Sequence, residues 1–181
     1  MITGIFTREA TIMKDDTVRI AGKIRHSSVN GPGVRYVVFF QGCPHKCKGC
    51  QNPETHDPLE GEEVYISELT DEIRNTRYID GITISGGEPL IQPHAVKKLA
   101  EAAHLKGLDV WLYTGWTYEE IMFDDTAKEV KNILKDLDVL VDGRFVDSLK
   151  SEGYLYRGSS NQRIIDVPES LDRGTVIELD L

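Results

Sequence analysis

Short apolar segments alternate along this chain with segments whose apolar residues recur at helical spacing, and this alternation limits the possible folds more than any other feature. Residues 34–40 are rich in β-branched and aromatic side chains and predict a strand that is buried on both faces. Shorter strands are predicted over residues 81–85, 109–113 and 139–141. Because helical patterns fall between these strands, the sequence predicts parallel strands that are joined by right-handed crossovers.

Three amphipathic segments supply the predicted helices. The first covers about residues 66–77, and the second begins near Pro93. The apolar positions that define the three helical faces are Ile66, Leu69 and Ile73, then Val96, Leu99, Ala100 and Ala103, then Ala127, Val130, Ile133, Leu134 and Leu137. Before residue 34 the chain has two short apolar stretches and the turn sequence of residues 30–33. After Asp147 we expect only loops and short strands.

We therefore expect an α/β fold with a mostly parallel sheet, in a single domain that spans residues 1–181. A complete eightfold barrel takes about 250 residues, so a chain of 181 residues predicts an open, partial (β/α) barrel. In such folds ligands bind at the carboxyl ends of the strands. The loops that follow the predicted strands are thus the first places to look for functional residues.

Charge and composition exclude several classes of function. The formal net charge is −9 and the sequence has no polybasic run, so nucleic acid is a poor partner. Hydrophobic residues make up 40% of the chain, as in an ordinary globular protein, and no segment is apolar for long enough to cross a bilayer. The N-terminus lacks the basic start and apolar run of a secretory signal. We expect no membrane partner and a cytoplasmic location.

The three cysteines of the chain all lie directly after the first predicted strand. Cys43, Cys47 and Cys50 have the spacing C-x3-C-x2-C, and an odd number of thiols in so short a segment favours a metal site over disulfides. Soft thiolates at this density bind zinc or an iron–sulfur cluster. The cysteines alone leave both open, along with unbound thiols, since His45 or His56 is a possible fourth ligand to zinc. His45 is otherwise a loop histidine that hydrogen-bonds or faces solvent.

A second motif follows the next predicted strand along the chain. Residues 82–85 run directly into Gly86-Gly87-Glu88-Pro89. Glycines at such a position let the backbone approach a ligand closely, and a carboxylate after them can pair with an ammonium group. Alone, this segment is more often a simple turn than a site. Together with a cysteine loop at the end of an earlier parallel strand, it indicates a cofactor site.

The two motifs together resemble the radical S-adenosylmethionine (SAM) superfamily, which has C-x3-C-x2-C after its first barrel strand and Gly-Gly-Glu-Pro after its second. Within that superfamily, the chain is similar to the activating proteins of anaerobic (class III) ribonucleoside-triphosphate reductases. Four segments carry this closer similarity: residues 42–55, 112–117, 139–145 and 157–165. The resemblance implies a radical SAM domain whose core covers about residues 31–166.

The resemblance implies a cluster enzyme in which Cys43, Cys47 and Cys50 are the catalytic residues and the metal ligands. They would bind three irons of a 4Fe-4S cluster, and the fourth iron would chelate the amino and carboxylate groups of SAM. An electron donor of the flavodoxin or ferredoxin type would drive the cleavage of SAM to methionine and a 5′-deoxyadenosyl radical. That radical would remove a hydrogen atom from a glycine of a large partner protein, the anaerobic ribonucleotide reductase. Three thiols cannot carry the additional clusters of several other activases.

The resemblance also implies which residues contact SAM. Residues 86–88 would hold the ammonium group, with Pro89 fixing the turn. Thr114 and Asp142 end later strands, where they reach the carboxylate or ribose or serve as plain turn and cap residues. Many superfamily members have an aromatic residue before the third cysteine, whereas this chain has a glycine there and a glutamine after it. The expected cofactor-binding residues are Gly49, Gln51, Gly86, Gly87, Glu88, Pro89, Thr114 and Asp142.

Three other interpretations stay open from the sequence. A radical SAM enzyme with a different target, either another glycyl-radical enzyme or a small molecule, would have the same site. A non-catalytic zinc-binding interaction module would bind zinc and leave SAM intact. A simple electron-transfer protein would need no Gly-Gly-Glu-Pro segment and would usually hold all four irons through cysteines.

Overall fold

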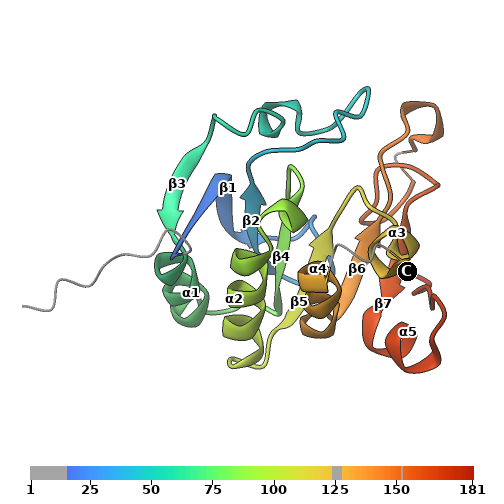
Figure 1. The fold of residues 1–181 in the computed structure, drawn as a ribbon. Helices are drawn as coiled ribbons and strands as arrows, with labels where there is room; N and C mark the ends of the chain where they lie inside the picture. The colour runs from blue at the N-terminus through green and yellow to red at the C-terminus, as the bar shows by residue number, and fades with distance from the viewer. Residues whose placement is uncertain (1–15, 124–127, 152) are drawn as a thin grey trace, which may run out of the picture.

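The computed structural model describes residues 16–123, 128–151 and 153–181, and within them seven strands form one mixed sheet in the order β3-β1-β2-β4-β5-β6-β7 (Figure 1). The strands are β1 (Thr17–Ser27), β2 (Arg35–Phe40), β3 (Glu62–Tyr65), β4 (Gly81–Gly86), β5 (Asp109–Tyr113), β6 (Val139–Asp142) and β7 (Arg163–Asp166). The α-helices are α1 (Ile66–Asn75), α2 (Pro93–His104), α3 (Tyr118–Phe123), α4 (Lys128–Ile133) and α5 (Val167–Arg173). Because β3 and β7 are edges, the described strands form an open sheet rather than a closed barrel.

Only the centre of the sheet is parallel. β2, β4, β5 and β6 pair in parallel, with Val38 opposite Ile84 and Leu112 opposite both Ile84 and Leu140. β1 pairs antiparallel with β2 and β3, and β7 pairs antiparallel with β6. The prediction of a mostly parallel sheet is therefore correct for these four strands and wrong for the other three. The physical reason at β1 is the short connection through residues 28–34, which permits only an antiparallel hairpin.

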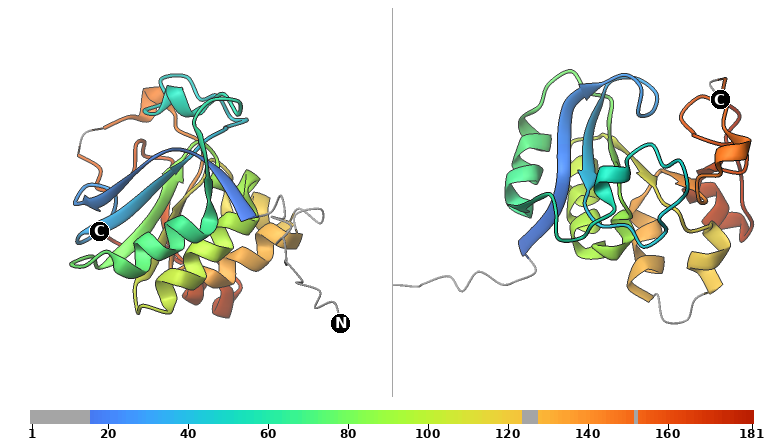
Figure 2. Two further views of the ribbon diagram at one scale, coloured as in Figure 1. Left: turned by 90° about the vertical axis from the view of Figure 1, so that its left-hand side faces the viewer. Right: turned by 90° about the horizontal axis from the view of Figure 1, so that it is seen from above.

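Side chains of the central strands alternate between two hydrophobic clusters, one on each face of the sheet. Tyr36 and Val38 of β2 belong to the larger cluster, which includes the apolar faces of α1 and α2. Trp111, Val139 and Val141 belong to a smaller cluster on the opposite face. Helices α1 and α2 lie side by side and cover the first face (Figures 1 and 2). The second face is thus free of these helices.

The apolar patterns do not predict β1, α3 or α5. Only three of the eleven residues of β1 are buried, so the strand has little hydrophobic alternation to detect. The short helix α5 depends on its caps: the Asp166 side chain accepts a hydrogen bond from Glu169 N, and Gly174 ends the helix with a left-handed backbone. Seven residues are too few for a clear helical period.

The predicted elements otherwise agree with the structure to within a few residues. The third predicted helix is shorter than its apolar pattern, because α4 ends at Ile133 and a 3₁₀ turn follows over Leu134–Asp136. Ala127, the first position of that pattern, lies outside the described residues. In the described parts of the chain, no helix is both long enough and apolar enough to cross a membrane.

Candidate active site

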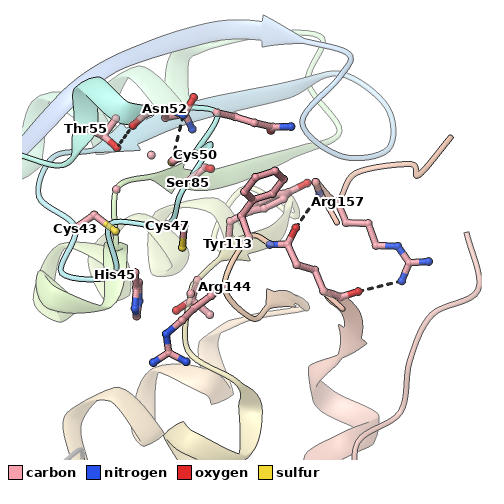
Figure 3. Close-up of a pocket in the computed structure, with 18 of the residues that line it drawn as sticks. Cys43, His45, Cys47, Cys50, Asn52, Thr55, Ser85, Tyr113, Arg144 and Arg157 are labelled. Atoms are coloured by element: carbon pink, nitrogen blue, oxygen red, sulfur yellow. Dashed lines mark hydrogen bonds between the residues drawn. The ribbon is translucent and has the colours of Figure 1, made fainter. Parts of the chain in front are cut away.

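A pocket of about 420 Å³ opens at the carboxyl ends of β2, β4 and β5 (Figure 3). The cysteine loop follows β2, the Gly-Gly turn ends β4, and Thr114 follows β5. The last residues of the same strands also line the pocket: Phe39 of β2, Ser85 of β4 and Tyr113 of β5. Parallel neighbours end at the same edge of a sheet, so three segments that are distant in sequence meet here.

All three cysteines line the pocket as free, half-buried thiols (Figure 3). Their loop is tightly turned, since Cys50 N donates to Cys47 O at 3.2 Å and Asn52 N donates to Cys50 Sγ at 3.4 Å. Burial raises the pKa of the Cys43 thiol, and hydrogen bonds with the backbone of His45 and Lys46 oppose that shift. A buried thiolate is stabilised by positive charge, which a metal centre at this pocket would supply.

Close approach of backbone explains the two glycines at the end of β4. A Cβ atom at Gly87 would lie 2.2 Å from the carbonyl oxygen of Gly42, and one at Gly86 would lie 2.4 Å from Phe40 N. Gly86 also has a φ of 105°, which disfavours any other residue. Gly87 N donates to Phe40 O and Glu88 N donates to Gly42 O, both at 2.8 Å. The Gly-Gly turn therefore lies directly against the start of the cysteine loop.

Glu88 is fully buried and does not line the pocket. Its carboxylate accepts hydrogen bonds from Thr114 Oγ1 at 2.9 Å, from Gly115 N at 2.8 Å and from Leu90 N at 3.1 Å. His45 Nε2 lies 2.8 Å from the second carboxylate oxygen. The resemblance implies a direct contact between this carboxylate and SAM, whereas here protein donors surround it.

The other expected residues divide between the pocket and its supports. Gln51 and Thr114 line the pocket, as do both glycines of the turn, whereas Gly49 and Pro89 do not. Gly49 has a φ of 74°, and a Cβ there would lie 2.9 Å from Asp147 Oδ1, so the turn itself requires glycine. Asp142, the last of the expected residues, belongs to a buried ion pair.

Asp142 is fully buried at the end of β6 and does not line the pocket. It accepts hydrogen bonds from Tyr118 N at 2.7 Å and from Arg163 Nε at 3.0 Å. Arg163 also pairs with Glu119, and hydrogen bonds to both carboxylates raise the pKa of its guanidinium. Asp142 thereby ties β7 and the start of α3 to the end of β6.

The far wall of the pocket comes from two later loops, which supply Arg144 and Arg157 (Figure 3) and also Tyr156. None of these three residues is among the site residues expected from the sequence. Gln162 joins these loops: its Oε1 accepts from Gly158 N at 2.8 Å and its Nε2 donates to the carbonyl of residue 143 at 2.9 Å. The sequence feature that could have identified these wall residues is the similarity of residues 139–145 and 157–165 to the activating proteins. Apolar periodicity could not find residues that pack through side-chain amides.

The charged side chains that line the pocket are cationic, although the chain as a whole is acidic. Arg144 and Arg157 are the charged side chains among the described lining residues, and no Asp or Glu belongs to that lining. Their guanidinium groups stack on aromatic rings, Arg144 over Trp116 at 5.1 Å and Arg157 over Tyr154 at 4.9 Å. Stacking helps to hold both guanidinium groups at the wall, and Arg144 also pairs with Glu120 at 3.0 Å, which leaves Arg157 as the cation of the lining without a carboxylate partner among the described residues. Such a lining suits a ligand that carries negative charge, such as a thiolate cluster or a carboxylate.

One histidine of the lining has an open nitrogen. Across the part of the chain that the structure describes, His56 Nε2 is the buried side-chain polar atom without a hydrogen-bond partner, and His56 lines the pocket. Its carbonyl oxygen accepts from Cys43 N at 3.2 Å.

Within residues 16–123, 128–151 and 153–181, no three His, Cys, Asp or Glu side chains converge on a point for one metal ion. In a 4Fe-4S cluster, by contrast, each cysteine binds an iron of its own.

Known proteins resemble this chain in sequence. A family model described as a 4Fe-4S single cluster domain matches residues 29–165. The anaerobic ribonucleoside-triphosphate reductase-activating protein of Salmonella typhi is 37% identical over 143 residues, which cover 74% of this chain and 89% of that protein. Proteins of the same name from Enterobacteria phage T4 and Vibrio cholerae serotype O1 are 36% and 38% identical, over 75% of this chain and 86% and 90% of theirs.

Among solved structures, QueE from Escherichia coli aligns with a TM-score of 0.46 and 20% identity, over 56% of this chain and 53% of that one. The matched family model covers residues 29–165, which include the cysteine loop and the loops of the far wall. Each of these three relatives covers about three quarters of the chain. This chain belongs to the family of anaerobic ribonucleoside-triphosphate reductase-activating proteins.

Proposed function

We propose that this chain is a radical SAM activase, which cleaves SAM reductively at a 4Fe-4S cluster and generates a glycyl radical on an anaerobic ribonucleoside-triphosphate reductase. The observation that carries the proposal is that Cys43, Cys47 and Cys50 are free thiols on the same pocket as Gly86 and Gly87. The names of the relatives point to the reductase as the target. The description of the matched family model supports the cluster.

The residues of the pocket fit these cofactors. When bound, the cluster and SAM supply a carbon-centred radical able to remove a hydrogen atom. The three cysteines, which are free thiols on this pocket, would hold the cluster, and with three thiols one iron would be left for SAM. Gly86 and Gly87 present backbone to the SAM ammonium group, while Gln51 and Thr114 line the space for the rest of SAM. Glu88 and Asp142 support the residues of the pocket rather than contacting the cofactors, because both are fully buried and neither lines the pocket.

The proposal extends to the fold. We infer an open radical SAM barrel in which residues 1–181 are one domain, with its core over about residues 31–166. A hydrophobic cluster that includes both Val18 of β1 and Val167 of α5 supports one domain. The open sheet, with edges at β3 and β7, supports entry of a loop from a large protein.

Reductive cleavage requires a one-electron donor, and we propose a flavodoxin or ferredoxin type. Lys46 and Lys48 are exposed on the cysteine loop, so positive charge lies close to the cluster ligands on an otherwise acidic chain. Opposite charge on a donor would steer it to this loop. The identity of the donor and a cytoplasmic location stay predictions from the sequence.

Anaerobic reconstitution with iron and sulfide tests the proposal. After reduction with dithionite, the protein should form 5′-deoxyadenosine from SAM and, with purified reductase added, produce a glycyl radical signal in electron paramagnetic resonance. The Cys43→Ser variant should do neither. A reductase whose target glycine is replaced by alanine should give deoxyadenosine without the radical.

Two outcomes contradict different parts of the proposal. Zinc binding with no iron uptake and intact SAM would refute the enzyme and favour the binding module. Cleavage of SAM without a radical on the reductase would refute the target alone and favour another glycyl-radical enzyme or a small molecule.

A further inference from the structure

We infer that His45 and Glu88 form an anchor that holds the cysteine loop against the ends of β4 and β5, so that both are positioning residues for the cluster ligands. In this chain, the carboxylate of the Gly-Gly-Glu-Pro segment acts on the cysteine loop instead of contacting SAM. The inference rests on the proposed function only for the identity of the group that the cysteines hold.

The imidazole of His45 lies in a slot between the cysteine loop and the end of β5. Only 4% of its side chain is exposed, and its ring packs edge-on against Trp116 with the centroids 4.5 Å apart. The slot exists because residue 115 is glycine: a Cβ on Gly115 would lie 2.3 Å from His45 Cδ2. The ring therefore has a fixed place on the wall, even though it belongs to a loop.

The carboxylate of Glu88 connects three segments of the chain. Leu90 N donates to it from its own turn, Thr114 Oγ1 and Gly115 N donate from the end of β5, and His45 donates from the cysteine loop. Since a carboxylate only accepts, the bond of 2.8 Å requires the proton on His45 Nε2. A carboxylate has about four acceptor sites, and these four donors occupy them. No site is left for an ammonium group of SAM.

The anchor acts on two cluster ligands at once. His45 lies between Cys43 and Cys47, so a fixed ring limits the positions of both thiols. Lys46, the next residue, has a φ of 48°, a backbone conformation that a residue with a side chain adopts only when its surroundings hold it. A loop held in its binding conformation before the cofactor arrives loses less conformational freedom on binding.

Hydrogen exchange of the cluster-free protein tests the anchor without any cofactor. His45→Phe keeps a ring in the slot but removes the donor, and should raise exchange of the amides of residues 43–50 about tenfold to a hundredfold, the range for loss of a hydrogen bond to a charged group. His45→Gln places an amide N–H near the position of Nε2 and should restore much of the protection. Exchange in the central strands should not change.

A second histidine–carboxylate pair supplies the matched control. His104 Nε2 lies 2.9 Å from Asp138 Oδ2, at a partly exposed site away from the pocket. His104→Phe should leave exchange in the cysteine loop unchanged. Equal loop exchange in wild type and His45→Phe would overturn the inference, as would a failure of His45→Gln to restore more protection than His45→Phe.

Glu88→Gln separates the anchor from a direct SAM contact. An anchor predicts faster loop exchange in the cluster-free protein, together with faster loss of iron to a chelator after reconstitution. A direct contact predicts unchanged loop exchange and weaker SAM binding by calorimetry, which would overturn the inference. If the protein binds no cluster at all, the proposed function fails while the exchange results still decide the anchor.

Discussion

The close contact between the Gly-Gly turn and the cysteine loop predicts a large effect of one methyl group. In Gly87→Ala, the new Cβ would lie 2.2 Å from Gly42 O, 2.8 Å from Gly42 C and 3.0 Å from Thr55 O. Ordinary contact begins near 3.4 Å, so the turn and the loop must separate by about 1 Å, the difference between 3.4 and 2.2 Å. Because all three atoms belong to the backbone, no side chain can rotate away.

The free energy follows from two effects. Overpacking of a well-packed region costs about 1–3 kcal/mol, and weakening of the two backbone hydrogen bonds across this contact, Gly87 N to Phe40 O and Glu88 N to Gly42 O, costs up to about 1 kcal/mol each. We expect Gly87→Ala to lower the free energy of unfolding by about 2–4 kcal/mol. For a chain of 181 residues, this corresponds to a Tm about 10 °C lower.

Urea denaturation of the cluster-free protein, followed by circular dichroism, measures this change. Gly22→Ala is the matched control, since Gly22 lies in β1 without a positive φ, and no atom beyond its chain neighbours lies within 4 Å of where the alanine Cβ would be. Alanine there should be neutral or add up to about 1 kcal/mol. If Gly87→Ala were as stable as Gly22→Ala to within about 0.5 kcal/mol, the reasoning from backbone contact would be refuted.

Three further predictions concern charge. Arg163→Gln leaves the buried carboxylate of Asp142 without its cation and should lower the free energy of unfolding by about 3 kcal/mol. The control Arg173→Gln, which removes an exposed ion pair, should cost under about 1 kcal/mol. Equal losses of stability in thermal denaturation would contradict this prediction. The hydrogen bond from Arg163 lowers the pKa of Glu119, so this contribution to stability is present above the ordinary carboxyl pKa and is lost as the pH falls through the lowered value. Arg163→Gln should therefore flatten the acid side of the curve of stability against pH, and an unchanged acid side would rule out this linkage. Burial raises the pKa of Cys43, which can be tested in a cluster-free variant that keeps only this thiol. Alkylation of the folded variant by iodoacetamide should reach half its maximal rate at a higher pH than alkylation of the same variant unfolded in urea. A midpoint pH at or below that of the unfolded variant would contradict the raised pKa.

The local features of the sequence predicted the centre of the molecule. Apolar runs and helical periods identified β2, β4, β5 and β6 with the helices α1 and α2, because burial of these elements is written into their own residues. The spacing of Cys43, Cys47 and Cys50 predicted a metal-binding loop, since thiols so close in sequence can meet without help from the rest of the fold. Both kinds of signal are short-range.

The edges of the sheet were predicted poorly. β1, β3 and β7 pair antiparallel, and neither the burial of β1 nor the length of β7 leaves a clear pattern. Their pairing depends on which neighbours the central strands leave free. A strand with few buried residues is defined by its hydrogen bonds to a partner, and that partner is known only once the sheet is formed.

The roles of individual polar side chains were decided by tertiary structure. Glu88 and His45 are 43 positions apart, and Asp142 and Arg163 are 21 apart, so no spacing rule connects them. The sequence determined by itself that thiols, glycines and a carboxylate would gather at the carboxyl ends of parallel strands. Only the folded chain decided which of them line the pocket and which are buried behind it, because burial depends on contacts between segments that are brought together by the sheet.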